Sequence, residues 1–235
     1  MALPPEYVYH ISTRINSQMR DIAKLEDCVD AASFVGDARA IVEAAKCHGF
    51  IIHSASSDEP SVYIIGFTHG HVPPASLSLT PSGAFLADLL DRSLLTGRDA
   101  MLVEGVPVGQ KVDEAFYGHD EWSVKSYLAM NRGRMARKAV FPAGADDLSL
   151  LGEQKRLFRR SIEEDRKGDA DASWAYQVKA TEKIIERDML YAAAIPDRRT
   201  FLFMGNAHVF AGIMQAKLEE AGRPYVTLVQ KGGNR

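Results

Sequence analysis

Residues 200–208 read TFLFMGNAH, an apolar run that ends in a glycine and leads to His208 three residues later. A continuous apolar stretch of this length is typical of a strand that is buried on both faces of a sheet. Comparable runs stand at 61–66, 100–103 and 225–229, and segments of helical periodicity separate them. This alternation predicts an α/β fold of three layers, in which helices flank a mainly parallel β-sheet.

The segments around these runs complete the predicted order of elements. Apolar positions spaced three or four residues apart predict helices, with breaks near Gly36 and Gly168, over 12–48, 85–95, 122–130, 148–194 and 211–221. Further strands are expected at 50–52 and 138–141, and 50–52 is expected to pair with 61–66 as a hairpin. We therefore predict one domain over 1–235, in which residues 1–49 form an N-terminal helical extension to an α/β core of residues 50–235 that carries additional central helices.

Composition excludes several classes of protein. The chain has 235 residues, 46% hydrophobic and 25% charged, with a formal net charge of −3, so it can build one sizeable core and gives no reason to expect a nucleic-acid partner. No apolar run approaches the ~20 residues of a membrane-spanning helix, and the first residues lack the pattern of a secretory signal. We expect a cytoplasmic protein with no membrane partner. Cys28 and Cys47 lack metal or redox spacing and are expected to be buried thiols.

Two histidines follow predicted strands at the same offset. His69 stands three residues after Gly66, and His208 stands three residues after Gly205. Because ligands bind outside the carboxyl ends of the strands in open α/β sheets, we expect the two histidines to converge there. Glycine at a strand end lets the backbone approach a ligand closely. The candidates for substrate binding are Gly66, His71, Gly205 and Asn206.

Two carboxylates belong to the same pattern. Glu104 directly follows an apolar strand, where a charge must be paired or bound to a cation. Asp146 ends the next predicted strand region, and Asp147 is the expected N-cap of the helix that follows. Each residue also has a purely structural interpretation: His69 and His208 as histidines at the core edge, His71 as a solvated loop residue, and Glu104 as the ion-pair partner of an arginine.

Together these elements resemble the Tiki/TraB/GumN group, within the superfamily that includes erythromycin-esterase-like and ChaN-like proteins. The resemblance covers roughly residues 60 to 230 and rests on YIIGFTH at 63–69, MLVEG at 101–105, IERDML at 185–190 and FMGNAH at 203–208. Asp146 and the pair Glu153-Gln154 stand where the group often has Gly-x-acid and Glu-Gln elements. The chain departs from the group at Phe67, where relatives often carry Thr or Glu, and residues 12–49 have no counterpart.

The resemblance implies a hydrolase that acts on a small-molecule or peptide substrate by cleaving an amide or ester bond. Its catalytic residues would be His69, Glu104, Arg187 and His208. His69, Glu104, Asp146 and His208 are also the residues expected to hold a divalent ion (Mn, Co, Zn or Fe), which would make bound water a nucleophile. In a metal-free version one histidine is the general base, Glu104 orients it and Arg187 holds the oxyanion. Arg187 is equally consistent with a salt bridge to Glu104 or Asp188.

Two alternatives of other classes stay open. ChaN-like relatives are associated with haem or iron, so the resemblance also implies a haem- or iron-binding protein without hydrolase activity. The chain has eight tyrosines and seven histidines as potential axial ligands. The other alternative is a catalytically inactive interaction module, against which the two intact Gly-x-x-His motifs argue. A covalent serine mechanism is disfavoured because no Gly-x-Ser-x-Gly elbow is present. The sequence sets no oligomeric state.

Overall fold

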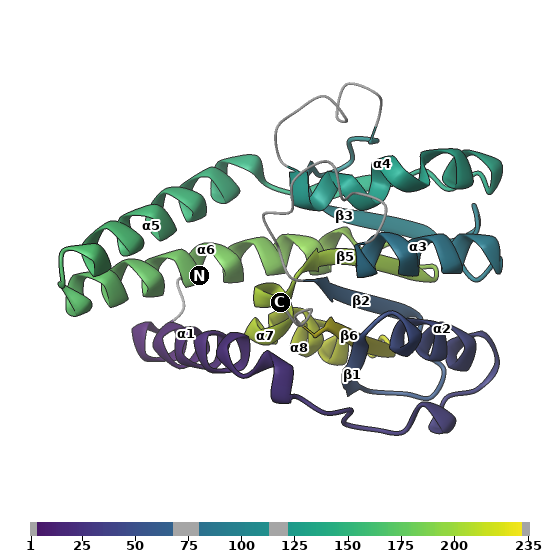
Figure 1. Cartoon of the computed structure of the whole chain (residues 1–235), viewed down its shortest axis with the longest axis horizontal. Coiled ribbons are helices and arrows are strands. Elements are labelled where there is room, and N and C mark those ends of the chain that lie inside the picture. Colours follow the sequence, from purple (N-terminus) through teal and green to yellow (C-terminus); the bar gives the residue numbers. More distant parts are fainter. Residues whose placement is uncertain (1–3, 68–79, 113–121, 232–235) are drawn as a thin grey trace.

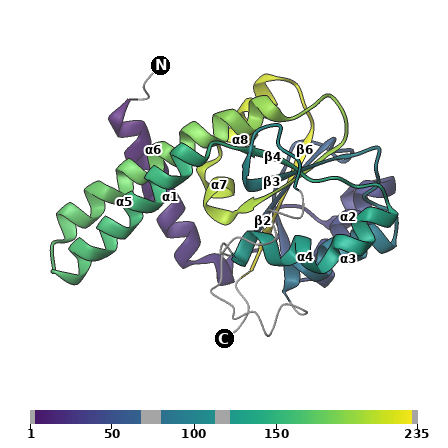
Figure 2. The ribbon, with the colours of Figure 1, turned by 90° about the horizontal axis from the view of Figure 1, so that it is seen from above.

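The structure, a computed structural model, describes residues 4–67, 80–112 and 122–231. Within these ranges a six-stranded sheet lies between helices (Figure 1 and Figure 2), which confirms the predicted three-layer α/β fold. The strands are β1 (Phe50–Ala55), β2 (Val62–Phe67), β3 (Ala100–Pro107), β4 (Ala143–Asp146), β5 (Thr200–Gly205) and β6 (Tyr225–Gln230). The helices are α1 (Pro5–Arg20), α2 (Gly36–Cys47), α3 (Pro81–Asp91), α4 (Trp122–Arg137), α5 (Leu148–Arg166), α6 (Ala170–Ala194), α7 (Asn206–Ala211) and α8 (Ile213–Glu220), with 3₁₀ turns η1 (Ile22–Lys24) and η2 (Ala31–Ser33).

The strand order brings five carboxyl ends to one edge of the sheet. The order is β1-β6-β2-β5-β3-β4, and every neighbouring pair except β1–β6 is parallel. Phe67 at the end of β2 pairs with Gly205 at the end of β5, and Asp146 at the end of β4 pairs with Pro107 of β3. Residues that follow these strands therefore start beside one another, as the strand-end pattern predicted.

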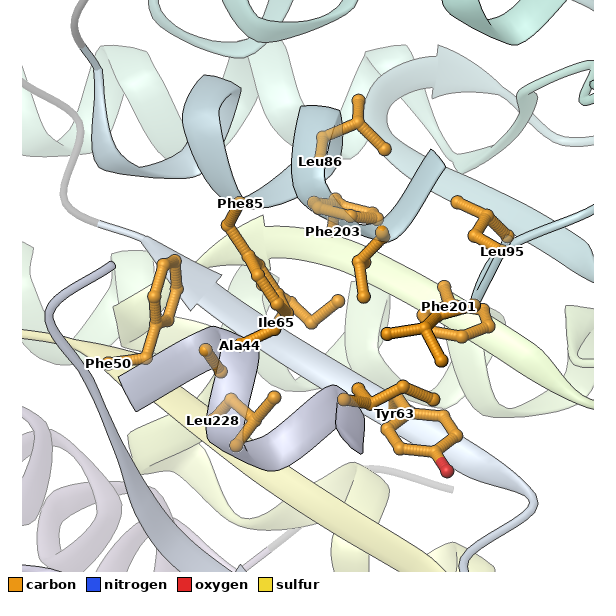
Figure 3. Packing of buried hydrophobic residues seen from close by; sticks show 14 of the residues in the cluster. Ala44, Phe50, Tyr63, Ile65, Phe85, Leu86, Leu95, Phe201, Phe203 and Leu228 are labelled. Carbon is orange, nitrogen blue, oxygen red and sulfur yellow. The ribbon is translucent and has the colours of Figure 1, made fainter. Parts of the chain in front are cut away.

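The core has two halves, one on each face of the sheet. Tyr63 and Phe201 stack with ring centroids 4.7 Å apart on the face covered by α2 and α3, where Phe203 joins them (Figure 3). Ile64 and Leu202 point to the other face and pack with residues of α1, α6, α7 and α8. Both faces of each central strand are buried, which is why these strands read as continuous apolar runs.

The side chains of N-cap residues fix the start of the two long helices. Asp147 accepts hydrogen bonds from the backbone N–H groups of Ser149 and Leu150, which confirms it as the N-cap of α5. Gly168, with φ of +82°, follows the end of α5, and Asp169 then caps α6. The predicted break is thus confirmed, and α5 and α6 form a hairpin that extends past the sheet, to the left in Figure 1 and Figure 2.

The predicted hairpin of 50–52 with 61–66 is wrong. β6 lies between the two strands, antiparallel to β1 and parallel to β2. All six residues of β6 are buried, whereas the second half of β1, from His53 onward, is only half-buried. A strand that is apolar on both faces gains most inside the sheet, and the more polar β1 suits the edge.

The predicted strand at 138–141 is also wrong, because the strand in this region, β4, begins only at Ala143. Ala139 has φ of +52°, outside the extended region, and Phe141 is 67% exposed. A Cβ on Gly144 would lie 2.0 Å from the carbonyl oxygen of Pro107, so only glycine permits the close approach of β3 and β4 here. A strand built from such small residues carries little hydrophobic signal.

The N-terminal helices contribute to both halves of the core. Val8, Ile11 and Ile15 of α1 are buried with α6, α7 and α8, while Ile41 of α2 is buried on the opposite face with α3. The two cysteines, however, do not join either half. Cys28 and Cys47 are exposed free thiols, so the expectation that they are buried is wrong.

None of the helices in the described ranges combines the length and the apolar composition that crossing a membrane needs.

Candidate functional site

Five buried ionisable side chains meet at the carboxyl ends of the parallel strands. They come from β3, β4, α6 and α7, and Glu104, the most exposed of them, retains only 6% of its accessible surface. We call these residues the charged cluster: Glu104, Asp146, Arg187, Asp188 and His208. Burial of so many charges is costly unless each is paired, so their contacts decide what the cluster can do.

Arg187 joins the two strand-end carboxylates. Its Nε and Nη2 atoms donate to the two carboxylate oxygens of Asp146 at 2.8 and 2.7 Å, and Nη2 also donates to Glu104 Oε1 at 2.8 Å. Nη2 further donates to the Tyr191 hydroxyl at 2.9 Å, and Nη1 donates to Gln154 Oε1. Burial would lower the pKa of Arg187, but the bonds to Asp146 and the charge of Glu104 raise it, so the guanidinium stays charged.

His208 lies between two carboxyl groups. Its Nδ1 is 2.6 Å from Asp188 Oδ1, and its Nε2 is 3.2 Å from Glu104 Oε1. Burial alone would lower the pKa of His208, but the charges of Asp188 and Glu104 outweigh burial and raise it to about 9. The side chain is therefore an imidazolium at neutral pH, with both N–H groups directed at carboxylates.

Backbone N–H groups at the strand ends hold the carboxylates in place. Gly205 donates its N–H to Glu104 Oε2 at 2.6 Å, and Gly105 donates to Asp146 Oδ2 at 2.8 Å. Asp147 donates its N–H to the other oxygen of Asp146 at 2.8 Å. The N–H of Gly205, a predicted substrate-binding residue, is thus used inside the cluster.

Gly66 and Asn206, also predicted to bind substrate, meet where α7 crosses β2. A Cβ on Gly66 would lie 2.5 Å from Asn206 Oδ1 and 2.7 Å from Val209 Cγ2. Asn206 is buried and donates from Nδ2 to the backbone oxygen of Gln230 at 3.2 Å. In this structure both residues have a packing role. Their contacts let α7, which carries His208, lie directly on the sheet.

Gly66→Ala is expected to lower the free energy of unfolding by about 1–3 kcal/mol, because the added methyl group must displace α7. Chemical denaturation measures this change. Gly152→Ala is the matched control, since a Cβ at this helical position of α5 meets no atom within 4 Å. It should leave stability unchanged or raise it by about 0.5–1 kcal/mol. Equal effects of the two substitutions would contradict the close packing.

His69 and His71 lie outside the described residues. The described part of β2 ends at Phe67, two residues before His69, and Phe67 is in register with Gly205. Of the residues predicted from the strand-end pattern, the structure brings together Glu104, Asp146, His208 and Gly205.

Sequence reasoning missed part of the cluster. Asp188 was expected only as a partner of Arg187, whereas it contacts His208, and the role of Tyr191 was not foreseen. The signal was present on α6: Arg187, Asp188 and Tyr191 are spaced as one helix face, and that face also carries the buried Ile184. Polar residues at buried positions of a helix must find polar partners.

In the described arrangement the members of the charged cluster are engaged with one another rather than open to a divalent ion, and His69, the fourth expected ligand, lies outside the described residues. A histidine ligand must be neutral, whereas the two carboxylates that face the ring nitrogens of His208 favour its imidazolium form. A guanidinium, itself a cation, stands between Glu104 and Asp146. Nor does any set of three or more His, Cys, Asp or Glu side chains in the described ranges have a metal-binding arrangement.

A groove of about 280 Å³ lies elsewhere, beside β3 and β4, where it is lined in part by residues 100–102, 108–109 and 143–144. Its walls include Met101, the exposed Phe141 and Pro196, and among the described residues that line it only Arg198 is charged. None of the cluster residues borders this groove. The candidate site is therefore the charged cluster rather than this cavity.

Comparisons of the chain with protein-family models, with curated proteins and with solved structures found no match in any of the three. The resemblance to the Tiki/TraB/GumN group therefore rests on the four motif segments of the sequence.

Proposed function

We propose that the chain is a hydrolase of an amide or ester bond in a small-molecule or peptide substrate, as its resemblance to the Tiki/TraB/GumN group implies. The observation that carries the proposal is the charged cluster at the carboxyl edge of the sheet. Desolvating each ion costs several kcal/mol, and apolar side chains would fill the same volume without that cost. Strongly perturbed ionisable groups gathered where α/β folds bind ligands favour a catalytic site.

The contacts support distinct roles for the cluster members. Glu104 is the most exposed of the five and is held by Arg187, His208 and a backbone N–H, so it is the carboxylate that meets the reacting groups. His208, backed by Asp188, places a fixed positive charge near the oxygen that becomes negative in the transition state, and it acts through its field because both of its N–H groups are directed at carboxylates. Arg187 is a positioning residue, because each of its nitrogens donates to a neighbouring side chain.

The base in this proposal is His69. It takes a proton from water as the water oxygen attacks the substrate carbonyl, and it returns that proton to the leaving group when the bond breaks. Its place in the sequence supports the assignment, since it follows β2 just beyond the residue in register with Gly205. Glu104 orients the base, as the metal-free version of the mechanism requires.

Glu104→Gln tests the proposal. Wild-type protein is offered a mixture of peptides and a panel of p-nitrophenyl esters, and products are followed by mass spectrometry and absorbance. The substitution removes the carboxylate charge at nearly constant shape and should lower turnover by about 10²–10⁴-fold. Glu43→Gln, an exposed carboxylate of α2 paired only at the surface with Arg39, should stay within twofold.

Two results would contradict the proposal: a wild type that cleaves nothing in the panel, or a Glu104→Gln variant as active as the wild type. A titration of the protein with haem tests the alternative, a haem-binding protein without hydrolase activity. Strong visible absorption from a stoichiometric complex, together with absent hydrolysis, would favour a haem-binding protein.

Hydrolysis is expected to be independent of divalent metals, because the cluster residues are engaged with one another and with Arg187. Dialysis against EDTA should change turnover less than twofold, and so should the addition of Mn, Co, Zn or Fe. Elemental analysis of the dialysed protein confirms that metal is gone. Activity that disappears with the metal and returns with one ion would overturn the metal-free mechanism in favour of the metal-dependent one.

A further inference from the structure

A side chain from the N-terminal extension donates hydrogen bonds to the helix that carries His208. Arg14 of α1 donates from Nε to the backbone oxygen of Phe210 at 2.9 Å and from Nη2 to the backbone oxygen of Ala211. These carbonyls belong to the last turn of α7, and α1 runs beside α7 in both Figure 1 and Figure 2. The last carbonyls of a helix lack partners within the helix, and a cation at that end is attracted to the negative end of the helix dipole.

The turn after α7 is shaped to admit this arginine. Gly212 has φ of +70°, and a Cβ on it would lie 2.9 Å from Arg14 Nη2. A side chain at this position would therefore conflict with both the backbone conformation and the guanidinium. The left-handed glycine and the arginine form one C-terminal cap on α7.

The opposite end of α7 is fixed by the charged cluster. Gly205 is the N-cap residue of α7, and its N–H bonds to Glu104 Oε2 at 2.6 Å. The helix has only six residues, and His208 lies between the two fixed ends. A helix this short has little stability of its own, so its position depends on what holds its termini.

We propose that Arg14 is a positioning residue for His208: it holds the end of α7 so that the imidazole lies between Asp188 and Glu104. The inference rests on the proposed function for its catalytic meaning, but the geometry it claims is independent of any substrate. Val8, Ile11 and Ile15 bury one face of α1 in the core, so Arg14 projects from a helix that is fixed in place. The N-terminal extension, which has no counterpart in the resemblance, thereby becomes part of the site.

The test uses the His208 Nδ1–H proton, which a 2.6 Å bond to a carboxylate makes strongly deshielded in the proton NMR spectrum. Selective ¹⁵N labelling of histidine assigns it in the full chain. Arg14→Ala should remove this resonance or broaden it beyond detection while unfolding stays cooperative, and Arg14→Lys should restore part of it. Arg20→Ala, an exposed arginine at the end of the same helix, should leave it unchanged.

Turnover supplies a second readout. Displacement of a group near the reacting atoms should lower kcat of Arg14→Ala about 10- to 100-fold with KM within twofold. If the wild type hydrolyses nothing, the proposed function fails while the resonance still decides the role of Arg14. Should Arg14→Ala not fold, Arg14→Met, which keeps the aliphatic stem, takes its place with the same expected loss. A full-intensity His208 resonance in a folded Arg14→Ala or Arg14→Met variant would overturn the proposal.

Discussion

Replacing Arg187 with alanine is expected to lower the free energy of unfolding by about 3–5 kcal/mol, which is the cost of leaving a buried charge without its partner. Arg187 is fully buried and is the guanidinium partner of both Glu104 and Asp146. Its removal leaves two buried carboxylates that repel each other and have lost their shared cation. Chemical denaturation at pH 7 measures the loss, provided that the variant still unfolds in one cooperative transition.

Lys179→Ala, an exposed position on the same helix, is the matched control and should change stability by less than about 0.5 kcal/mol. Arg187→Lys keeps the charge but cannot form the bidentate pair with Asp146, so a partial loss is expected. A loss below about 1 kcal/mol for Arg187→Ala would mean that the two carboxylates are not held as ions by this residue.

Asp188→Asn is expected to lower turnover by about 10²–10⁴-fold, because the amide cannot sustain the positive charge of His208. Asp188 is buried and contributes, together with Glu104, to raising the pKa of His208 to about 9 against the lowering effect of burial. Without the Asp188 charge, burial should dominate and the imidazole should become neutral near pH 7. Asp171→Asn, an exposed carboxylate in the first turn of the same helix, should leave turnover within twofold.

The same pair makes a prediction for stability against pH. A histidine whose pKa is about 9 in the folded protein and about 6.5 when unfolded stabilises the fold fully below pH 6.5. That contribution declines as pH rises and is gone above pH 9, a loss on the order of 3 kcal/mol. Denaturation at pH 6, 7.5 and 9.5 should show the decline in the wild type and a smaller one in Asp188→Asn. A wild type that gains stability from pH 6.5 to 9 would contradict the assignment.

The sequence predicted those strands whose position is marked by a local hydrophobic pattern. The central strands were found because a strand covered on both faces must be apolar along nearly its whole length, as 201–204 is. β4 was missed because its close approach to β3 requires small residues such as Gly144, which carry no hydrophobic pattern. The placement of β6 between β1 and β2 was missed because pairing between distant segments leaves no local signal.

The site divides in the same way. Glu104, Asp146 and His208 were expected to meet because the ends of parallel strands share an edge, and the structure brings them together. The partner of Asp188 could not be predicted, since it depends on the rotation of α6 against α7. The contact of Gln154 with Arg187 depends in turn on how α5 lies against α6.

The central claim is that the charged cluster holds His208 as a preorganised imidazolium between Asp188 and Glu104. A ¹⁵N NMR titration of the His208 ring, assigned with a His208→Gln variant, tests this claim without any substrate. We predict that both ring nitrogens are protonated at pH 7 and that the group titrates with a pKa near 9. A neutral imidazole at pH 7, with a pKa at or below the ordinary value of about 6.5, would contradict the account.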